Sequence, residues 1–319
     1  MKATTVSPKD SAQLQHAPMP IVVGVGRSGT TLLRLMLDAH PNLAMTHETG
    51  FIPSMQGLSS PLHLGFYSRL KTAVRGHGWT QSLREEFIRL LTSQPNWNDF
   101  HIHREQLRES LTQLEPFNIS DGLRIFFRLY AARFDKPRWG DKTPNYCLHL
   151  GTIAQILPET RFIHIIRDGR DASLSVRGLH FAPGHDMETL ASHWVSTITA
   201  ARLQSRRCSH YLEVRYEDLV LDTTTVLRKI CAFTELDYDA GMEEYYKSAP
   251  LRISELEPTR DRRGNILVTR ETRQQTNRLT TQPPRPERVA RWKSELTEDE
   301  RATFKRIAGA LLEDLGYEV

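Results

Sequence analysis

The apolar residues fall into short β-branched runs that alternate with stretches at helical spacing, a pattern typical of an α/β fold. The first run covers residues 20–25 and leads into a glycine-rich turn, after which residues 32–37 show helical spacing. Runs at 161–166 and 210–220 predict two further strands. We therefore expect a central, mostly parallel sheet with a phosphate-binding turn and flanking helices.

The region 51–136 shows helical spacing without an evident strand pattern, and it predicts a helical cap over the substrate site. Thr80 is expected to begin one of its helices and Ser120 to cap another. The polar stretch 139–144 predicts a turn between helical segments. The segment 250–293 is rich in arginine and predicts a basic, helix-poor loop.

The turn after the first run has the composition of an anion cradle. Gly24, Gly26 and Gly29 allow a tight turn, so that the amides of residues 28–31 can point at a phosphate on the helix N-terminus. A nucleoside triphosphatase loop would need lysine where Thr30 stands.

A dinucleotide-binding fold is a second interpretation of the same turn, because the three glycines are followed by Glu48 at the spacing expected for a ribose ligand. That fold requires repeated βαβ units, and the helical stretch 51–136 counts against it. A third interpretation takes residues 27–31 as one unit, in which an arginine and three hydroxyls surround a phosphate.

A second basic turn follows the run at 161–166. Arg167 is expected at the carboxyl edge of the sheet, where ligands bind in open α/β folds. Ser175 lies about two helical turns further on, and both side chains could fold onto one anion.

The composition narrows the classes of protein to which the chain can belong. The chain has 319 residues, 39% of them apolar, and a net charge of only +4, so general nucleic-acid binding is not implied. Its three cysteines are too few and scattered for a disulfide framework or a zinc site, which favours a reducing, cytoplasmic location. Residues 1–19 predict a disordered tail, residues 20–319 predict a single domain, and no apolar run is long enough to span a membrane.

Three motifs, at 24–33, 139–144 and 167–175, resemble those of sulfotransferases that use 3'-phosphoadenosine 5'-phosphosulfate (PAPS). The bacterial group, with features of protein-tyrosine sulfotransferases, is the most similar. The resemblance implies a PAPS co-substrate, no metal, and a basic lid at 250–293 over the nucleotide. The nucleotide-binding residues that it implies are Arg27, Ser28, Gly29, Thr30, Thr31, Arg167, Ser175 and Arg291.

The resemblance also suggests which residues carry the chemistry. Glu48 would be the base that takes the acceptor proton, with His47 as an alternative, while Lys142 and Arg27 would balance charge on the transferred group. An ordinary ion pair of Glu48 with Arg27 or Lys142 is the competing interpretation. Cytosolic small-molecule sulfotransferases have lysine in place of Arg27 and a catalytic histidine within 141–143, so this chain departs from them.

The acceptor is not specified by any motif. A tyrosine hydroxyl of a peptide or protein is favoured, because a phenol is more easily deprotonated by a carboxylate than an alcohol is. A small-molecule, sugar or lipid hydroxyl is the alternative within the same class. An NAD(P)-binding oxidoreductase or a non-catalytic nucleotide-binding protein is the alternative of another class.

Overall fold

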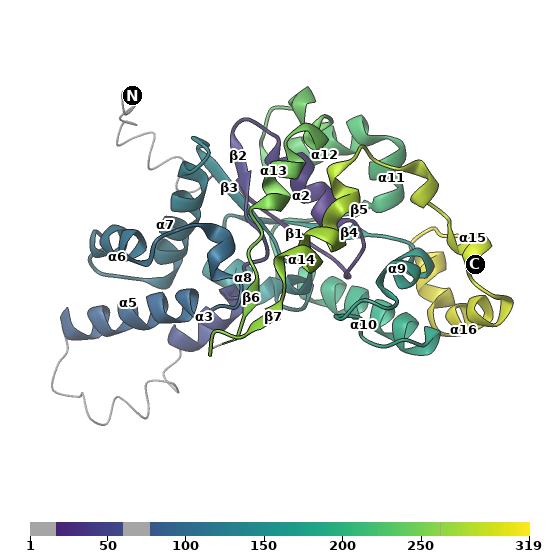
Figure 1. Cartoon of the computed structure of the whole chain (residues 1–319), viewed down its shortest axis with the longest axis horizontal. Coiled ribbons are helices and arrows are strands. Elements are labelled where there is room, and N and C mark those ends of the chain that lie inside the picture. The colour runs from purple at the N-terminus through teal and green to yellow at the C-terminus, as the bar shows by residue number, and fades with distance from the viewer. Residues whose placement is uncertain (1–16, 60–76, 262) are drawn as a thin grey trace.

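A five-stranded parallel sheet forms the centre of the chain (Figure 1). The computed structural model describes residues 17–59, 77–261 and 263–319, so most of the predicted tail and part of the predicted cap lie outside the described residues. The strands run in the order β2-β3-β1-β4-β5. Their bounds are β1 Met19–Val23, β2 Leu43–Met45, β3 Arg138–Lys142, β4 Thr160–Ile166 and β5 Tyr211–Arg215.

Strand β1 occupies the middle of the sheet, and every one of its residues is buried. Val22 pairs with Lys142 of β3 on one side and with Ile163 of β4 on the other. All the strands run parallel, so the turns after β1, β3 and β4 emerge at one edge of the sheet. This edge is where ligands bind in open α/β sheets. The predicted fold class is confirmed.

Helices cover both faces of the sheet (Figure 1). The face that includes Val22 packs against helices α2 and α12, and the face that includes Ile21 packs against the cap. A third cluster joins Trp194 and Phe304 beside the end of β4. The helices outside the cap and the carboxyl-terminal segment are α2 Thr30–Asp38, α8 Leu150–Ile156, α9 Gly169–Val176, α10 Met187–Ser205, α11 Tyr216–Leu221 and α12 Thr223–Thr234.

The described part of the cap is helical, as predicted, although two predicted helix starts are wrong. Helix α5 begins at His77, upstream of Thr80. Helix α7 is capped by Asn118, whose side chain accepts from an amide in the first turn, whereas Ser120 lies inside the helix and donates to Ile156 O at 2.7 Å. The cap helices are α3 Ile52–Ser59, α5 His77–Thr92, α6 Arg104–Thr112 and α7 Ile119–Ala132, with the 3-10 turn η1 Trp97–Phe100.

The stretch predicted as a turn at 139–144 is in fact mostly strand β3. Its residues are polar, so they give no apolar alternation, and the strand forms because it lies between β2 and β1. Gly140 permits this close packing, since a Cβ there would lie 2.4 Å from Met45 Sδ and 2.6 Å from Pro20 O. The 3-10 turn η2 Pro144–Leu148 follows the strand.

The basic segment 250–293 is more ordered than predicted. It contains helix α14, which is capped by the Thr269 side chain, and a two-stranded hairpin, so the helix-poor expectation is wrong. Its elements are α13 Ala249–Ser254, β6 Thr259–Arg260, β7 Ile266–Val268, α14 Arg270–Asn277, η5 Arg278–Thr281 and η6 Pro286–Arg288. The short turns before it are η3 Ala240–Met242 and η4 Tyr245–Lys247, and the helices after it are α15 Trp292–Glu295 and α16 Glu298–Asp314. Within the described ranges, no helix combines the length and the apolar character needed to cross a bilayer.

Candidate functional site

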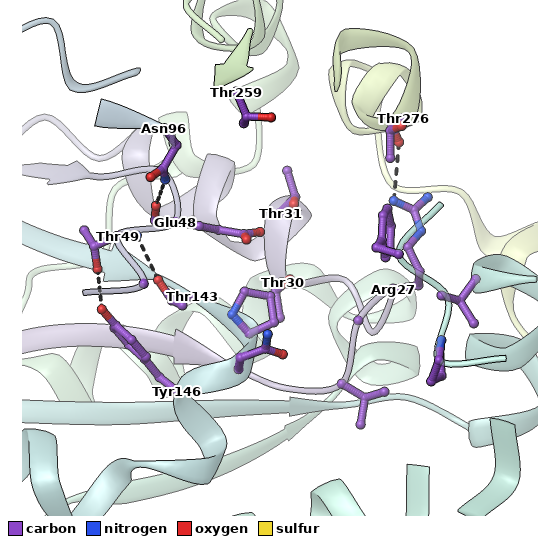
Figure 2. A pocket seen from close by; sticks show the side chains of 18 of the residues that line it. Arg27, Thr30, Thr31, Glu48, Thr49, Asn96, Thr143, Tyr146, Thr259 and Thr276 are labelled. Atoms are coloured by element: carbon purple, nitrogen blue, oxygen red, sulfur yellow. Dashed lines mark hydrogen bonds between the residues drawn. The ribbon is translucent and has the colours of Figure 1, made fainter. Parts of the chain in front are cut away.

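Two adjoining cavities lie at the edge of the sheet where β1, β3 and β4 end. The larger has a volume of about 1030 Å³ and is lined by the first turn, the segment after β2, and α14 (Figure 2). The smaller, of about 100 Å³, lies between the turn after β4 and the segment 279–288. Arg27, Thr30 and Thr31 line both cavities, so the two spaces meet at the glycine-rich turn.

The glycine-rich turn presents the N-terminus of α2 to these cavities. Gly29 has φ of 97°, a left-handed conformation that favours glycine, and a Cβ there would lie 2.4 Å from the Tyr216 ring. Helix α2 begins at Thr30, and the first amides of a helix have no partner within it. The Ser28 hydroxyl is buried and has no hydrogen-bond partner among the described residues. Together these groups can receive an anion.

Three arginines gather around this turn. Arg27 donates to Ser175 Oγ and to Thr276 O, each at 3.3 Å. Arg167 donates to Arg27 O at 3.3 Å and to Arg288 O at 2.7 Å. The predicted neighbours Arg27, Arg167 and Ser175 therefore lie together, with Arg288 as an addition.

The electrostatic environment of these arginines favours a bound anion. Burial lowers the pKa of Arg27, and the charges of Arg167 and Arg288 lower it further. Burial likewise lowers the pKa of Arg288, with repulsion from Arg291 and Arg167 adding to the effect. Like charges held together in a low-dielectric setting are relieved by a negative ligand. The arrangement is therefore suited to phosphate or sulfate groups.

The smaller cavity also contains residues to which the sequence analysis assigned no binding role. Tyr216 lines it and holds Arg167 over its ring, 4.5 Å from the ring centroid. Glu217, by contrast, accepts from Asp168 N at 3.0 Å and supports the turn after β4. Tyr216 gave no signal because aromatic residues at strand ends are usually core, and Arg288 was one of many arginines in a basic segment.

Arg291 pairs with a carboxylate, and its charge acts on the neighbouring Arg288. Its guanidinium pairs with Glu295 at 2.6 Å within the start of α15, and it is absent from the described lining of both cavities. Arg288, three residues earlier, lines the smaller cavity. Trp292 is buried in the cluster that α9, α10 and α16 form.

Glu48 lines the larger cavity and pairs with Lys142, which is buried behind the wall and absent from the described lining of both cavities. Lys142 Nζ donates to Glu48 Oε1 at 2.6 Å. The lysine side chain is 6% exposed, while that of Glu48 is 54% exposed and lines the cavity beside Thr49. The pairing with Lys142 that the sequence left open is therefore present, and it holds the carboxylate at the cavity wall. Asn96 donates to the Glu48 carbonyl from the cap (Figure 2).

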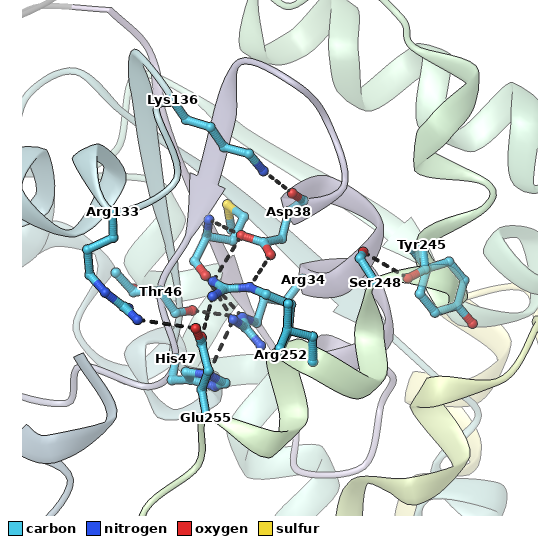
Figure 3. Close-up of polar contacts among 12 residues, drawn as sticks. Arg34, Asp38, Thr46, His47, Arg133, Lys136, Tyr245, Ser248, Arg252 and Glu255 are labelled. Carbon is cyan, nitrogen blue, oxygen red and sulfur yellow. Dashed lines mark hydrogen bonds and ion pairs between the residues drawn. The ribbon is translucent and has the colours of Figure 1, made fainter. Parts of the chain in front are cut away.

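His47 is a poor alternative to Glu48 as a base. It is buried behind the cavity wall, where Arg34 Nη2 lies 3.4 Å from its Nε2 (Figure 3). Burial, followed by the charges of Arg34 and Arg252, lowers its pKa well below the ordinary value. Arg34 also donates to Met45 O at 3.0 Å, so this arginine holds the end of β2 in place.

The hairpin and α14 also line the larger cavity. Thr259 and Val268 of β6 and β7 line the larger cavity, and Arg273 of α14 lines it while pairing with Asp99 at 2.7 Å. Within the described ranges, no group of three or more His, Cys, Asp or Glu side chains is arranged to hold a metal ion.

Comparison with known proteins assigns this arrangement to a family. The family model described as "Sulfotransferase family" matches residues 18–240. Protein-tyrosine sulfotransferase A of Caenorhabditis elegans is 23% identical over 317 residues, which cover 97% of this chain and 70% of the relative.

Two solved structures share the fold. The sulfotransferase domain of the Synechococcus PCC 7002 olefin synthase has a TM-score of 0.58 at 22% identity, covering 95% of each chain. The sulfotransferase domain from the curacin biosynthetic pathway has a TM-score of 0.56 at 18% identity, covering 95% of this chain and 99% of that one. The family match extends over well more than half of the sequence, and the chain therefore belongs to the sulfotransferase family, enzymes that transfer a sulfuryl group.

Proposed function

We propose that the chain transfers a sulfuryl group from PAPS to an acceptor hydroxyl. The observation that carries the donor assignment is the convergence of Arg27, Arg167 and Arg288 around the smaller cavity. The N-terminus of α2 would receive the 5'-phosphosulfate, and Arg167 with Ser175 would receive the 3'-phosphate. Tyr216, beside Arg167, would face the adenosine part of the donor.

The chemistry would be an in-line displacement at sulfur. Glu48 would take the proton of the acceptor hydroxyl as its oxygen bonds to sulfur, and the bond from sulfur to the bridging oxygen would break. The electron pair of that bond stays with the leaving bisphosphate. Lys142 and Arg27 would stabilise the charge that develops on the bridging and equatorial oxygens. The ion pair of Glu48 with Lys142 supports these roles, because it would bring the proposed base and the proposed cation together for this step.

Nucleotide selectivity tests the donor assignment. Isothermal titration calorimetry should show adenosine 3',5'-bisphosphate binding at least ~10-fold more tightly than ADP, because the second phosphate would gain charge-assisted bonds at Arg167. NAD should bind weakly. Equal affinities for the bisphosphate and ADP would count against PAPS as donor.

Replacing the base tests the catalytic assignment. Glu48→Gln keeps the shape of the side chain but cannot take a proton, so turnover should fall by roughly 100-fold while bisphosphate affinity changes little. Glu85→Gln is a matched control, because Glu85 is similarly exposed and pairs with Arg108 at 2.9 Å far from the cavities. If Glu48→Gln turned over at the control rate, Glu48 would not be the base.

For the acceptor, we propose a tyrosine hydroxyl on a peptide or protein. Support comes from the curated relatives, several of which are named protein-tyrosine sulfotransferases, and from a carboxylate base suited to a phenol. A cavity of about 1030 Å³ can admit a side chain together with the donor. The basic segment 250–293 would favour acidic residues near the tyrosine. The cytoplasmic location stays a prediction.

The acceptor proposal is tested by competition among hydroxyls. Labelled PAPS is supplied with an acidic tyrosine peptide, the same peptide with phenylalanine, and a panel of phenols, sugars and lipids. Labelling that requires the tyrosine and exceeds every small acceptor supports the proposal. Labelling confined to a sugar or lipid hydroxyl overturns it and leaves the donor assignment intact.

A further inference from the structure

Asp141 lies behind the Glu48–Lys142 pair and joins the two strand ends that carry it. Its carboxylate is fully buried and accepts from two hydroxyls, Thr46 Oγ1 at 2.7 Å and Thr143 Oγ1 at 2.9 Å. Thr46 follows β2, two residues before Glu48, and Thr143 follows Lys142. The Asp141 carboxylate therefore links Thr46, close to the proposed base, to Thr143, next to the proposed cation.

Thr49, the residue after Glu48, is also bonded to the segment that follows β3. Thr49 donates its backbone N–H to Thr143 Oγ1 at 3.0 Å, and its hydroxyl lies 2.7 Å from the Tyr146 hydroxyl (Figure 2). Tyr146 also accepts from Ile52 N at 3.0 Å, at the start of the cap. The residues on both sides of Glu48 are thus fixed to the segment that carries Lys142, although the Glu48 side chain itself is half exposed.

Burying the Asp141 carboxylate costs free energy of folding, and we therefore ask what role offsets this cost. A buried carboxylate normally has a cationic partner. Among the described residues none lies within ion-pairing distance of this one, although the charge of Lys142 acts on it. It is also absent from the described lining of both cavities, so it does not face the substrate. By contrast, Arg34 donates to Met45 O and Thr46 O, and so holds the end of β2 to α2 (Figure 3).

We propose that Asp141 is a positioning residue that sets the placement of Glu48 relative to Lys142 through the hydroxyls of Thr46 and Thr143. The proposal rests on the catalytic roles assigned above to Glu48 and Lys142. Because a misplacement of about 1 Å at a reacting group can cost ~100-fold in rate, the effect of this carboxylate should appear in turnover.

Two single variants test the connection. Asp141→Asn keeps the shape but offers one acceptor to two hydroxyls, so kcat should fall ~10-fold or more while the Kd for adenosine 3',5'-bisphosphate stays within ~2-fold. Thr143→Val removes the hydroxyl and leaves Asp141 in place, and it should give a similar loss. Thr234→Val is the control, because its buried hydroxyl donates to Ile230 O at 2.8 Å within a distant helix.

A double variant separates positioning from general damage. With Glu48→Gln already present, Asp141→Asn should lower kcat by less than ~2-fold more, because the group that it positions no longer acts as a base. If the double variant lost kcat by the product of the two single losses, the proposal would be overturned. A wild-type kcat in both Asp141→Asn and Thr143→Val would overturn it as well. If Glu48→Gln alone kept the wild-type rate, the assignment of the base would fail instead.

Discussion

Replacing Asp141 by asparagine should have opposite effects on stability at low and high pH. Burial raises the pKa of this carboxyl from its ordinary value of 3.8 to about 6, while hydrogen bonds from Thr46 and Thr143 partly oppose the change. The difference corresponds to about 3 kcal/mol at neutral pH. Because the side chain is fully buried, solvent screening does not reduce this value appreciably.

Whether the free energy of unfolding rises or falls with pH depends on which state, folded or unfolded, binds the proton of Asp141 more tightly. The pKa is higher in the folded protein, so the folded state carries more protons between about pH 4 and pH 6. The free energy of unfolding of the wild type should therefore lose about 3 kcal/mol from this group as pH rises through that window. Asparagine does not titrate, but it loses one hydroxyl contact at every pH, which costs about 1 kcal/mol.

The expected result is a crossover. Relative to wild type, Asp141→Asn should be about 1 kcal/mol less stable near pH 4 and about 2 kcal/mol more stable near pH 8. Urea unfolding of both proteins at several pH values measures this difference, with Thr234→Val as a variant whose difference should not depend on pH. A constant difference between wild type and Asp141→Asn across the range would refute the reasoning, because it would mean that the carboxyl titrates alike in both states.

Arg167→Ala should weaken adenosine 3',5'-bisphosphate binding ~10- to 100-fold in calorimetry with little change for ADP, and equal losses would contradict the 3'-phosphate assignment. Gly29→Ala should lower the free energy of unfolding by about 1–3 kcal/mol, because φ is 97° and the new Cβ would meet the Tyr216 ring; a variant with wild-type melting behaviour would argue against it. Trp292→Ala should cost about 3–5 kcal/mol, since Trp292 is buried and stacks 3.5 Å from the Arg170 guanidinium, yet bisphosphate affinity should be unchanged.

The parts of the fold that the sequence predicts are those governed by local signals. The β-branched run of β1, the glycine turn and the start of α2 are contiguous, and each residue type fits its conformation there. Arg167 and Ser175 were predicted from a strand followed by a basic turn, and both line the smaller cavity. Membership of the sulfotransferase family, predicted from these motifs, is confirmed.

The parts that the sequence did not predict depend on contacts between distant segments. Strand β3 is polar, and its conformation comes from its neighbours β2 and β1 rather than from its own residues. The Glu48–Lys142 pair joins residues 94 positions apart, so the sequence could offer it only as one of two alternatives. Arg288 could not be told from the other arginines of its segment until the fold placed it beside Arg167.

Burial perturbs three charged groups in or behind the proposed site. Burial and mutual repulsion lower the pKa of both Arg27 and Arg288, while burial raises the pKa of Asp141. A bound anion would relieve the repulsion between Arg27 and Arg288. Because Arg27 also donates to Thr276 O, binding of the anion would also affect how α14 packs against the glycine turn. No substrate would relieve the burial of Asp141, because its carboxylate is enclosed. If the proposed roles hold, stability would be lost in one place to attract the donor and in another to position Glu48, which is the pattern expected where function rather than packing selects the residues.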